Sequence, residues 1–145
     1  MIGIDIEEIN RFNSWSDKEF LRIMSLKELE YAKSRKNPPE HLCGFYCVRE
    51  ALVKALNKND IVFNKIETDH EKSGKPYLVE NEYLKEIMKI CGVKQIEISI
   101  SHSKHYAVAL VLARKSRQYL LNLKQLNIFL SKKHCNQNVC VKIKK

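Results

Sequence analysis

The sequence predicts an α+β domain in which a mainly antiparallel sheet packs against a central helix. Three observations lead to this fold class. Residues 2–8 and 95–103 alternate apolar and polar side chains with the period of two that is typical of a strand. Residues 40–56 carry apolar side chains at helical spacing, and 106–113 form a continuous apolar run. The expected order of elements, β-α-α-β-α-β-β, favours an α+β arrangement.

The N-terminal segment "MIGIDIEEI" predicts a strand with an acidic face. Ile2, Ile4 and Ile6 point to one side of this strand, and Gly3, Asp5 and Glu7 point to the other. Residues 17–35 are expected to be helical, and "SLKE" at 25–28 has the capping-box form, which marks a second helix start. Pro38 and Pro39 then break this helical region.

The central helix, from about Glu40 to Leu56, is apolar almost all the way round and is therefore expected to be buried. It nevertheless carries Arg49, Glu50 and Lys54 in its middle. A charge is costly to bury unless it is paired or bound to a ligand. These three side chains are therefore candidates for a functional site.

The rest of the chain up to residue 113 completes the expected domain. "DIVFNKIET" at 60–68 predicts a strand, and "KSGKPYL" at 72–78 predicts a turn. Residues 80–91 predict a short helix that Gly92 ends. The run "YAVALVLA" at 106–113 is typical of a strand that is buried on both faces.

Charge and composition separate the chain into two parts. The chain of 145 residues has a formal net charge of +9, but all 17 acidic residues lie within the first 97 positions, whose net charge is −1. We therefore expect a domain at 1–113 and a basic extension at 114–145, formed by an amphipathic helix and a polar tail. That extension either covers the core or serves as a basic arm for an acidic partner or a membrane surface.

The expected compartment is the cytoplasm. The five cysteines match no CxxC pattern and are expected to be reduced thiols. No apolar run approaches the roughly 20 residues that cross a bilayer, and the acidic N-terminus does not resemble a secretory signal.

Unusual polar residues gather on three of the predicted elements. Asp5 and Glu7 share one side of the first strand, and Glu50 and Lys54 lie one helical turn apart. His102 ends a strand. Two carboxylates from different elements suit Mg²⁺, with waters and phosphate completing its shell, and a nearby lysine would neutralise that phosphate. Each residue taken singly is also explained by a solvated side chain or a simple helix ion pair.

Four motifs in order resemble those of the 4′-phosphopantetheinyl transferases, and in particular the short single-domain type that acts on acyl carrier protein. They are "GIDIEEINRF", "REALVKAL", "SGKPYL" and "ISISHSKHYAVALVLA", and together they run from about Ile2 to Ala113. The resemblance implies the fold of that family. It also implies transfer of phosphopantetheine from coenzyme A, the substrate, to a serine of apo acyl carrier protein, with Mg²⁺ as cofactor and a role in fatty acid biosynthesis.

The resemblance also implies roles for individual residues. Asp5 and Glu50 would hold Mg²⁺, Lys54 would contact phosphate, and Glu50 would act, directly or through a water, as the base for the carrier serine. The residues expected to bind coenzyme A are His102, Lys54, Arg49, Ser101, Lys75 and Pro76. The residues expected to meet the acidic helix of the carrier protein are Arg11 and Arg22.

The sequence departs from the family pattern at three places. Arg49 stands where the family has lysine, and the loop "NKNDIVF" is shorter than its counterpart and lacks glycine. Glu7 stands where the short type has a neutral residue; it is either a third metal ligand or a solvated acid. The resemblance further implies a homotrimer with active sites between subunits, and it leaves open which subunit supplies His102 to a given site.

A non-enzymatic module that binds nucleic acid through the basic C-terminal part is the alternative function. It would explain the charge of the extension but not the charged residues of the central helix. The sequence also contains no motif that reads RNA or DNA, and we therefore expect no nucleic-acid partner. Because no apolar run is long enough to cross a bilayer, we also expect no membrane span.

Overall fold

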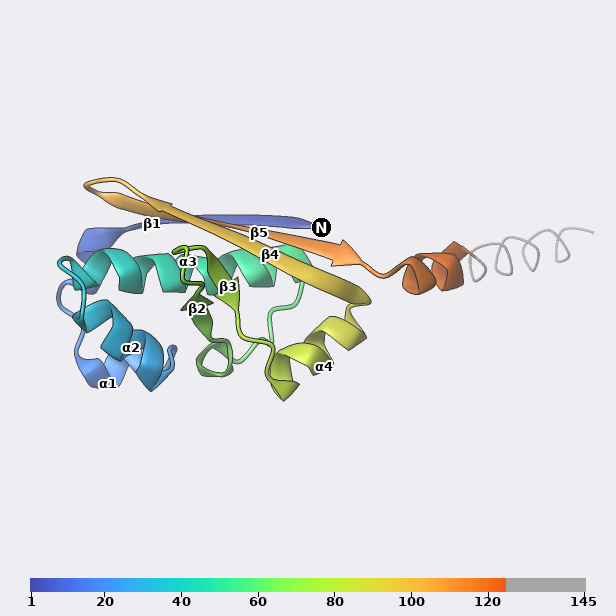
Figure 1. Cartoon of the computed structure of the whole chain (residues 1–145), viewed down its shortest axis with the longest axis horizontal. Helices are drawn as coiled ribbons and strands as arrows, with labels where there is room; N and C mark the ends of the chain where they lie inside the picture. The colour runs from blue at the N-terminus through green and yellow to red at the C-terminus, as the bar shows by residue number, and fades with distance from the viewer. Residues whose placement is uncertain (125–145) are drawn as a thin grey trace, which may run out of the picture.

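The computed structural model describes residues 1–124 as an antiparallel sheet that lies along one long helix (Figure 1). The sheet contains β1 (Ile2–Glu8), β4 (Val93–His102) and β5 (Tyr106–Lys115) in the order β1-β5-β4. The helix is α3 (Pro38–Leu56), which packs against β1 and β5. This arrangement confirms the predicted α+β class and the central helix.

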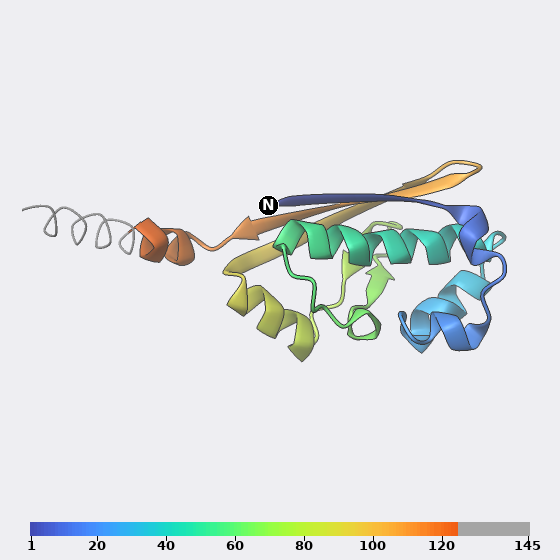
Figure 2. The same cartoon turned by 180° about the vertical axis from the view of Figure 1, so that it is seen from behind.

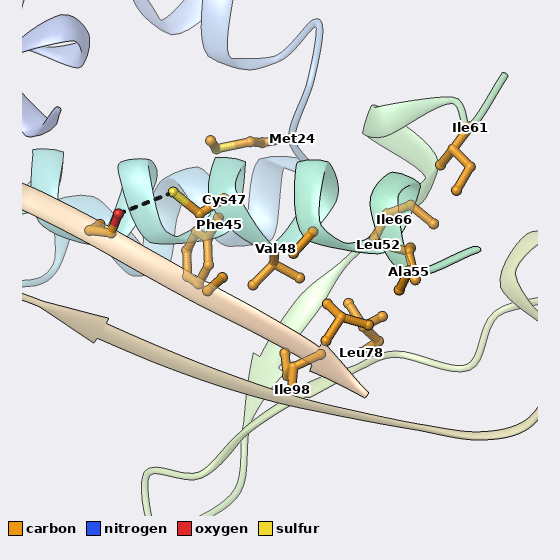
Figure 3. Close-up of a cluster of buried hydrophobic side chains, with 14 of the residues drawn as sticks. Met24, Phe45, Cys47, Val48, Leu52, Ala55, Ile61, Ile66, Leu78 and Ile98 are labelled. Carbon is orange, nitrogen blue, oxygen red and sulfur yellow. Dashed lines mark hydrogen bonds between the residues drawn. The ribbon is translucent and has the colours of Figure 1, made fainter. Parts of the chain in front are cut away.

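The helix α3 forms where the sequence predicts it, and the two prolines begin it rather than precede it. Pro38 and Pro39 occupy the first helical positions, where a backbone N–H has no partner within the helix to lose. The helix ends at Leu56 and is capped by Asn57, which adopts the left-handed conformation with φ 51°. Eleven of its residues are buried, and Figure 3 shows several of them in the core.

Close contact between β1 and α3 requires a glycine. A Cβ atom on Gly3 would lie 2.0 Å from the carbonyl oxygen of Ala51 and 2.6 Å from the nitrogen of Ala55. No side chain fits there, because both neighbours are helix backbone. Gly3 therefore lets the strand approach the helix closely, and it brings Asp5 to the helix surface beside Lys54.

The elements on the other side of α3 are short (Figure 2). The turn η1 (Ile9–Phe12) and α1 (Asp17–Phe20) precede α2 (Leu26–Lys33). The capping box at Ser25 is present, with Ser25 Oγ accepting from the Glu28 N–H at 3.2 Å and the Glu28 carboxylate accepting from the Ser25 N–H at 2.9 Å. The predicted helical region at 17–35 is thus two helices separated by a turn.

The predicted strand at 60–68 is wrong. This segment contains the 3₁₀ turn η2 (Phe63–Lys65), and the strand β2 (Thr68–His70) begins only at the last predicted residue. Arg49 of α3 accounts for the difference, because its guanidinium donates to the carbonyl oxygens of Phe63 and Ile66 and folds the segment onto the helix.

A hairpin and a short helix follow this turn. β2 pairs with β3 (Pro76–Leu78), and the predicted turn at 72–78 lies between them and extends into β3. The helix α4 (Glu82–Ile90) is capped by the side chain of Asn81. It ends before Gly92, whose φ of 65° favours glycine, as predicted.

The two faces of the sheet differ in burial. On β1 the acidic face lies inward, with Gly3 and Asp5 buried, while Ile2, Ile4 and Ile6 are 68%, 57% and 61% exposed. On β5 the alanines and Val111 face α3, and the other residues are half-buried or exposed, so the expectation that this strand is buried on both faces is wrong for the single chain. We call the solvent-facing apolar residues the outer sheet face: Ile2, Ile4, Ile6, Val108, Leu110 and Leu112.

The start of the basic extension is attached to the domain. β5 continues to Lys115, and residues 117–124 are helical. The Ser116 N–H donates to the Gly92 carbonyl at 2.8 Å. The Tyr119 ring packs so closely on Gly92 that a Cβ atom at this position would lie only 2.2 Å from the ring. The predicted polar tail lies outside the described residues, and the proposed domain boundary at residue 113 stays a prediction.

Across residues 1–124, none of the helices has the length and apolar character needed to cross a membrane. Cys43, Cys47 and Cys91 are free thiols. Cys135 and Cys140 lie outside the described residues.

Candidate active site

The first part of the site is an ion pair between β1 and α3. Asp5 is buried, and its Oδ1 lies 2.6 Å from Nζ of Lys54, whose side chain is about half exposed. The hydrogen bond to Asp5 is the main reason that the pKa of Lys54 is raised, and the charge of Glu50 adds to it. The sequence-predicted trio of Asp5, Glu50 and Lys54 is therefore brought together at one place.

Asp5 also has an oxygen without a partner. Its Oδ2 is buried and accepts no hydrogen bond from residues 1–124. Cys47 lies close to this carboxylate, and its hydrogen bond with Cys43, its burial and the proximity of Asp5 raise the pKa of its thiol; the thiol donates to the Ala107 carbonyl at 3.5 Å and leaves Oδ2 without a donor. A buried carboxylate oxygen with no donor is costly unless a cation or a proton satisfies it. Residues 1–124 contain no group of three metal-ligating side chains, so Asp5 could offer a hard cation such as Mg²⁺ one carboxylate and Glu50 a second, with waters and phosphate as the remaining ligands.

Glu50 lies at the border of this site. It is half-buried rather than fully buried, and the Tyr46 hydroxyl donates to its Oε1 at 3.0 Å. Tyr46 precedes Glu50 by one helical turn, so both side chains leave α3 on the same side. The hydrogen bond engages one of the two carboxylate oxygens of Glu50.

Glu7 and Arg11 form an ion pair next to the ring of Tyr46. Nη1 of Arg11 lies 2.8 Å from Oε1 of Glu7, and this bond is the main reason that the pKa of Arg11 is raised. The guanidinium carbon lies 5.0 Å from the centre of the Tyr46 ring. Glu7 thus shares the inward side of β1 with Asp5, but its carboxylate is held by Arg11. Its expected role as a metal ligand stays a prediction.

Arg49 is not part of this site. Its side chain is fully buried, and it bonds the Glu28 carboxylate at 2.6 Å and the Phe45 carbonyl at 2.9 Å in addition to the two carbonyls of the η2 region. Glu28 in turn accepts from the Thr68 N–H at 2.9 Å. The burial contradicts the expectation that Arg49 contacts coenzyme A; Arg49 joins α2, α3 and the segment before β2.

The second part of the site is a cleft of about 220 Å³ at the start of α3. His102, at the end of β4, lines it with Pro76 and Gly74 of the hairpin and with Glu40 and His41. Nδ1 of His102 lies 3.6 Å from the Glu40 carboxylate. The cleft therefore unites two of the four motifs, "SGKP" and "SISH". Lys75 and Ser101 are exposed next to it.

The two parts of the site do not meet within one chain. β5 lies between the strands that carry Asp5 and His102, with Asp5 opposite Ala109 and His102 opposite Ala107. Along α3, Glu40 precedes Glu50 by ten residues, which is about 15 Å of helix. His102 thus contacts the start of the helix, whereas Lys54 and Glu50 lie toward its end.

Three contributors to these sites were not predicted from the sequence. Tyr46 could have been found from its i, i+4 spacing to Glu50. His41 and His70 line the cleft, and burial lowers the pKa of both. Neither histidine stands in a recognisable pattern, since the hairpin and the helix start bring them together only in the fold. The predicted carrier-binding Arg22 is exposed in the turn between α1 and α2.

Comparison with known proteins agrees with the motifs. The model of the 4′-phosphopantetheinyl transferase superfamily matches residues 1–135. A holo-[acyl-carrier-protein] synthase of Halothermothrix orenii is 34% identical over 120 residues, which are 79% of this chain and 96% of that protein. The synthase of Buchnera aphidicola is 40% identical over 121 residues, with the same coverage of the two chains.

Solved structures resemble the fold over the same region. The holo-(acyl-carrier-protein) synthase of Bacillus anthracis, in complex with CoA (3′,5′-ADP), aligns with a TM-score of 0.65 and 33% identity over 79% of this chain and 96% of that one. The Helicobacter pylori synthase in complex with coenzyme A aligns with a TM-score of 0.67 and 27% identity over 78% of this chain and 99% of that one.

Proposed function

The chain belongs to the 4′-phosphopantetheinyl transferase superfamily, and we propose that it transfers the phosphopantetheine arm of coenzyme A to a serine of apo acyl carrier protein. The observation that carries this proposal is the buried Asp5, which is paired with Lys54 through one oxygen and has no partner at the other. The relatives named above are synthases of the holo carrier protein, and two of the solved relatives hold coenzyme A or its nucleotide part.

In this reaction Glu50 accepts the proton of the carrier serine. The serine oxygen forms a bond to the phosphorus that carries pantetheine, and the bond from that phosphorus to the bridging oxygen breaks. Adenosine 3′,5′-bisphosphate leaves with the electron pair of that bond. Lys54, whose side chain is about half exposed, would neutralise the diphosphate as negative charge grows on it.

We further propose that Asp5 and Glu50 hold Mg²⁺. The unpartnered Oδ2 of Asp5 and the half-buried Glu50 supply the hard oxygen ligands that this ion takes, with phosphate and water as the rest. When bound, Mg²⁺ supplies charge neutralisation of the diphosphate. When coenzyme A binds, the ammonium group of Lys54 would form an ion pair with phosphate, and its pair with Oδ1 of Asp5 would weaken.

The cleft around His102 is proposed to hold the remainder of coenzyme A. His102 and the exposed Lys75 and Ser101 offer donors to phosphate, and Pro76 forms part of the wall. These groups come from the two motifs that the metal side of the site does not use.

We propose a homotrimer, as the resemblance to the short transferases implies, and the separation of the two parts supports a complete site that lies between subunits. The outer sheet face presents an apolar stripe that a single chain leaves open to water, as Ile2, Ile4 and Ile6 show. Packing this face against other copies would bury it, and we propose that in such an assembly a neighbouring subunit supplies His102 to the site of Asp5 and Glu50. His102 is thus proposed to act in the neighbour's site.

The carrier protein is proposed to dock at the exposed Arg11, with Arg22 assisting. Arginines at a rim meet an acidic helix through long-range attraction, which sets the encounter rate and its salt dependence. A cytoplasmic protein that supports fatty acid biosynthesis is the setting that fits a carrier-protein substrate and the free thiols of residues 1–124. The nucleic-acid alternative has no comparable support among these residues.

Mass spectrometry of the carrier protein tests the proposed function. Apo acyl carrier protein is incubated with this protein, coenzyme A and Mg²⁺, and the carrier is expected to gain the mass of one phosphopantetheine. Asp5→Asn and Glu50→Gln should abolish the gain in mass. Chemical denaturation should show that both variants are still folded under the conditions of the assay. No gain with any acyl carrier protein tried would refute the function, and near-normal turnover of either variant would refute the metal assignment.

A further inference from the structure

Tyr46 has a ring that is held on three sides. Its ring centre lies 5.4 Å from that of Phe12 and 6.2 Å from that of Phe63, and the guanidinium of Arg11 covers a further side at 5.0 Å. The residue is half-buried on α3. A ring packed in this way has little freedom to rotate away, so the direction of its hydroxyl is fixed by the fold.

That hydroxyl donates to Oε1 of Glu50 at 3.0 Å. A phenol hydroxyl is a hydrogen-bond donor at neutral pH, and here it donates to a carboxylate, which can only accept. One oxygen of Glu50 is thereby held in place. The other oxygen is then directed by the geometry of the carboxylate rather than by free rotation of the side chain.

The ring of Tyr46 also supports Arg11. The guanidinium is attached to Glu7 at 2.8 Å and stacks on Tyr46, and it lies within 5.7 Å of the Phe12 ring. Stacking on aromatic faces orders an arginine that would otherwise be mobile at the surface. One side chain therefore contacts both the carboxylate of the reaction and the arginine assigned to the carrier.

We propose that Tyr46 is a positioning residue with two separable effects, in which its hydroxyl orients Glu50 for the transfer step and its ring holds Arg11 in place for the carrier protein. This inference rests on the proposed function and adds a residue that none of the four motifs assigns. It follows that removing the hydroxyl alone should change turnover, and that removing the ring should also change carrier binding.

Two substitutions separate the effects. Tyr46→Phe keeps the ring and its contacts, and we expect kcat to fall about tenfold with the KM for the carrier unchanged, since a misdirected catalytic group costs rate rather than binding. Tyr46→Leu also removes the face on which Arg11 stacks, and we expect the same fall in kcat with a KM for the carrier about fivefold higher. The KM for coenzyme A should change in neither variant.

The matched control is Tyr83→Phe. The Tyr83 hydroxyl is also hydrogen-bonded, since it accepts from the Val62 N–H at 2.7 Å, but Tyr83 is on α4, whereas Glu50 is on α3. Its kcat should equal that of the wild type. Arg11→Gln should raise the KM for the carrier and leave kcat unchanged, which reproduces the ring effect of Tyr46 without the hydroxyl effect.

The results distinguish this inference from the function on which it rests. If the wild type transfers no phosphopantetheine, the function fails and the inference fails with it. If the wild type is active and Tyr46→Phe keeps the wild-type kcat, only the inference fails. An equal fall in kcat in Tyr83→Phe would also overturn the inference. So would a fall in kcat of Tyr46→Phe that is accompanied by a lower melting temperature, since either result indicates a general structural effect.

Discussion

Substitution of Arg49 distinguishes two roles for this residue: binding of coenzyme A, as the family resemblance implies, and a buried ion pair with Glu28, as the structure shows. Both side chains have no exposed area, and their N–O distance is 2.6 Å. Arg49→Met would leave the Glu28 carboxylate buried without its counter-charge. Removal of one partner from a buried pair costs about 3–5 kcal/mol, against a typical total stability of about 5–15 kcal/mol.

Three further contacts of Arg49 add to this estimate. Its guanidinium also serves the carbonyl oxygens of Phe45, Phe63 and Ile66. Arg49→Lys keeps the charge but cannot reach all of these acceptors, and the loss of two such hydrogen bonds corresponds to about 1–3 kcal/mol. We therefore expect stability to fall in the order wild type, Arg49→Lys, Arg49→Met.

Chemical denaturation followed by circular dichroism measures these differences, and the KM for coenzyme A is measured on the same proteins at a temperature where each is folded. The structure predicts a lower free energy of unfolding and an unchanged KM. A normal denaturation midpoint together with a raised KM would refute the structural role and restore the prediction that Arg49 binds coenzyme A.

Three other predictions concern the sites and the sheet. Lys54→Met should lower stability, because it leaves the buried carboxylate of Asp5 without its counter-charge, but by less than Arg49→Met, because the lysine end of the pair is half exposed to water. Transfer should fall about 10²–10³-fold in a steady-state assay, and a loss below threefold would remove Lys54 from the mechanism. Ile4→Asp should convert the assembly to monomers in light scattering, since it places a charge on the outer sheet face; a persistent trimer would contradict that interface. The pKa values of His41 and His70 are lowered, mainly by burial, from 6.5. The unfolded chain therefore binds more protons as the pH falls, and stability should be lost progressively below about pH 6.5. Denaturation midpoints at pH 7.5 and 5.5 should differ less in the His41→Asn, His70→Asn double variant, and an equal difference would contradict the assignment.

Periodicity predicted most elements of the fold because their signals are local. The capping box at Ser25, the helix end at Gly92 and the alternation of β1 each depend on residues within a few positions of one another. Alternation does not say which face of β1 lies inside, however. Gly3 decides this, because only a glycine lets the strand contact α3, and the isoleucines are left outside.

Long-range contacts explain what the sequence did not predict. The segment 60–68 has the composition of a strand, but Arg49 binds its carbonyl groups and turns it into a 3₁₀ turn. The helix pattern showed Arg49 as one of three charges, and its partner Glu28 lies 21 positions earlier in the chain. Asp5, Glu50 and Lys54 could be predicted because their positions follow from local patterns: Asp5 lies on an alternating strand, and Glu50 and Lys54 are one helical turn apart. The histidine cleft depends on the hairpin packing against the start of α3, which no local pattern records.

Asp5, Glu50 and Lys54 of one subunit are proposed to form the transferase site together with His102 of the neighbouring subunit. Glu50→Gln and His102→Ala are each expected to be inactive alone. When the two proteins are mixed in equal amounts and allowed to exchange subunits, about one quarter of the sites in a random mixture should combine an intact Glu50 with an intact His102. Mass spectrometry of the carrier protein should then show transfer at about a quarter of the wild-type rate. No recovery of transfer in a mixture that native mass spectrometry shows to contain both subunits would contradict the shared site.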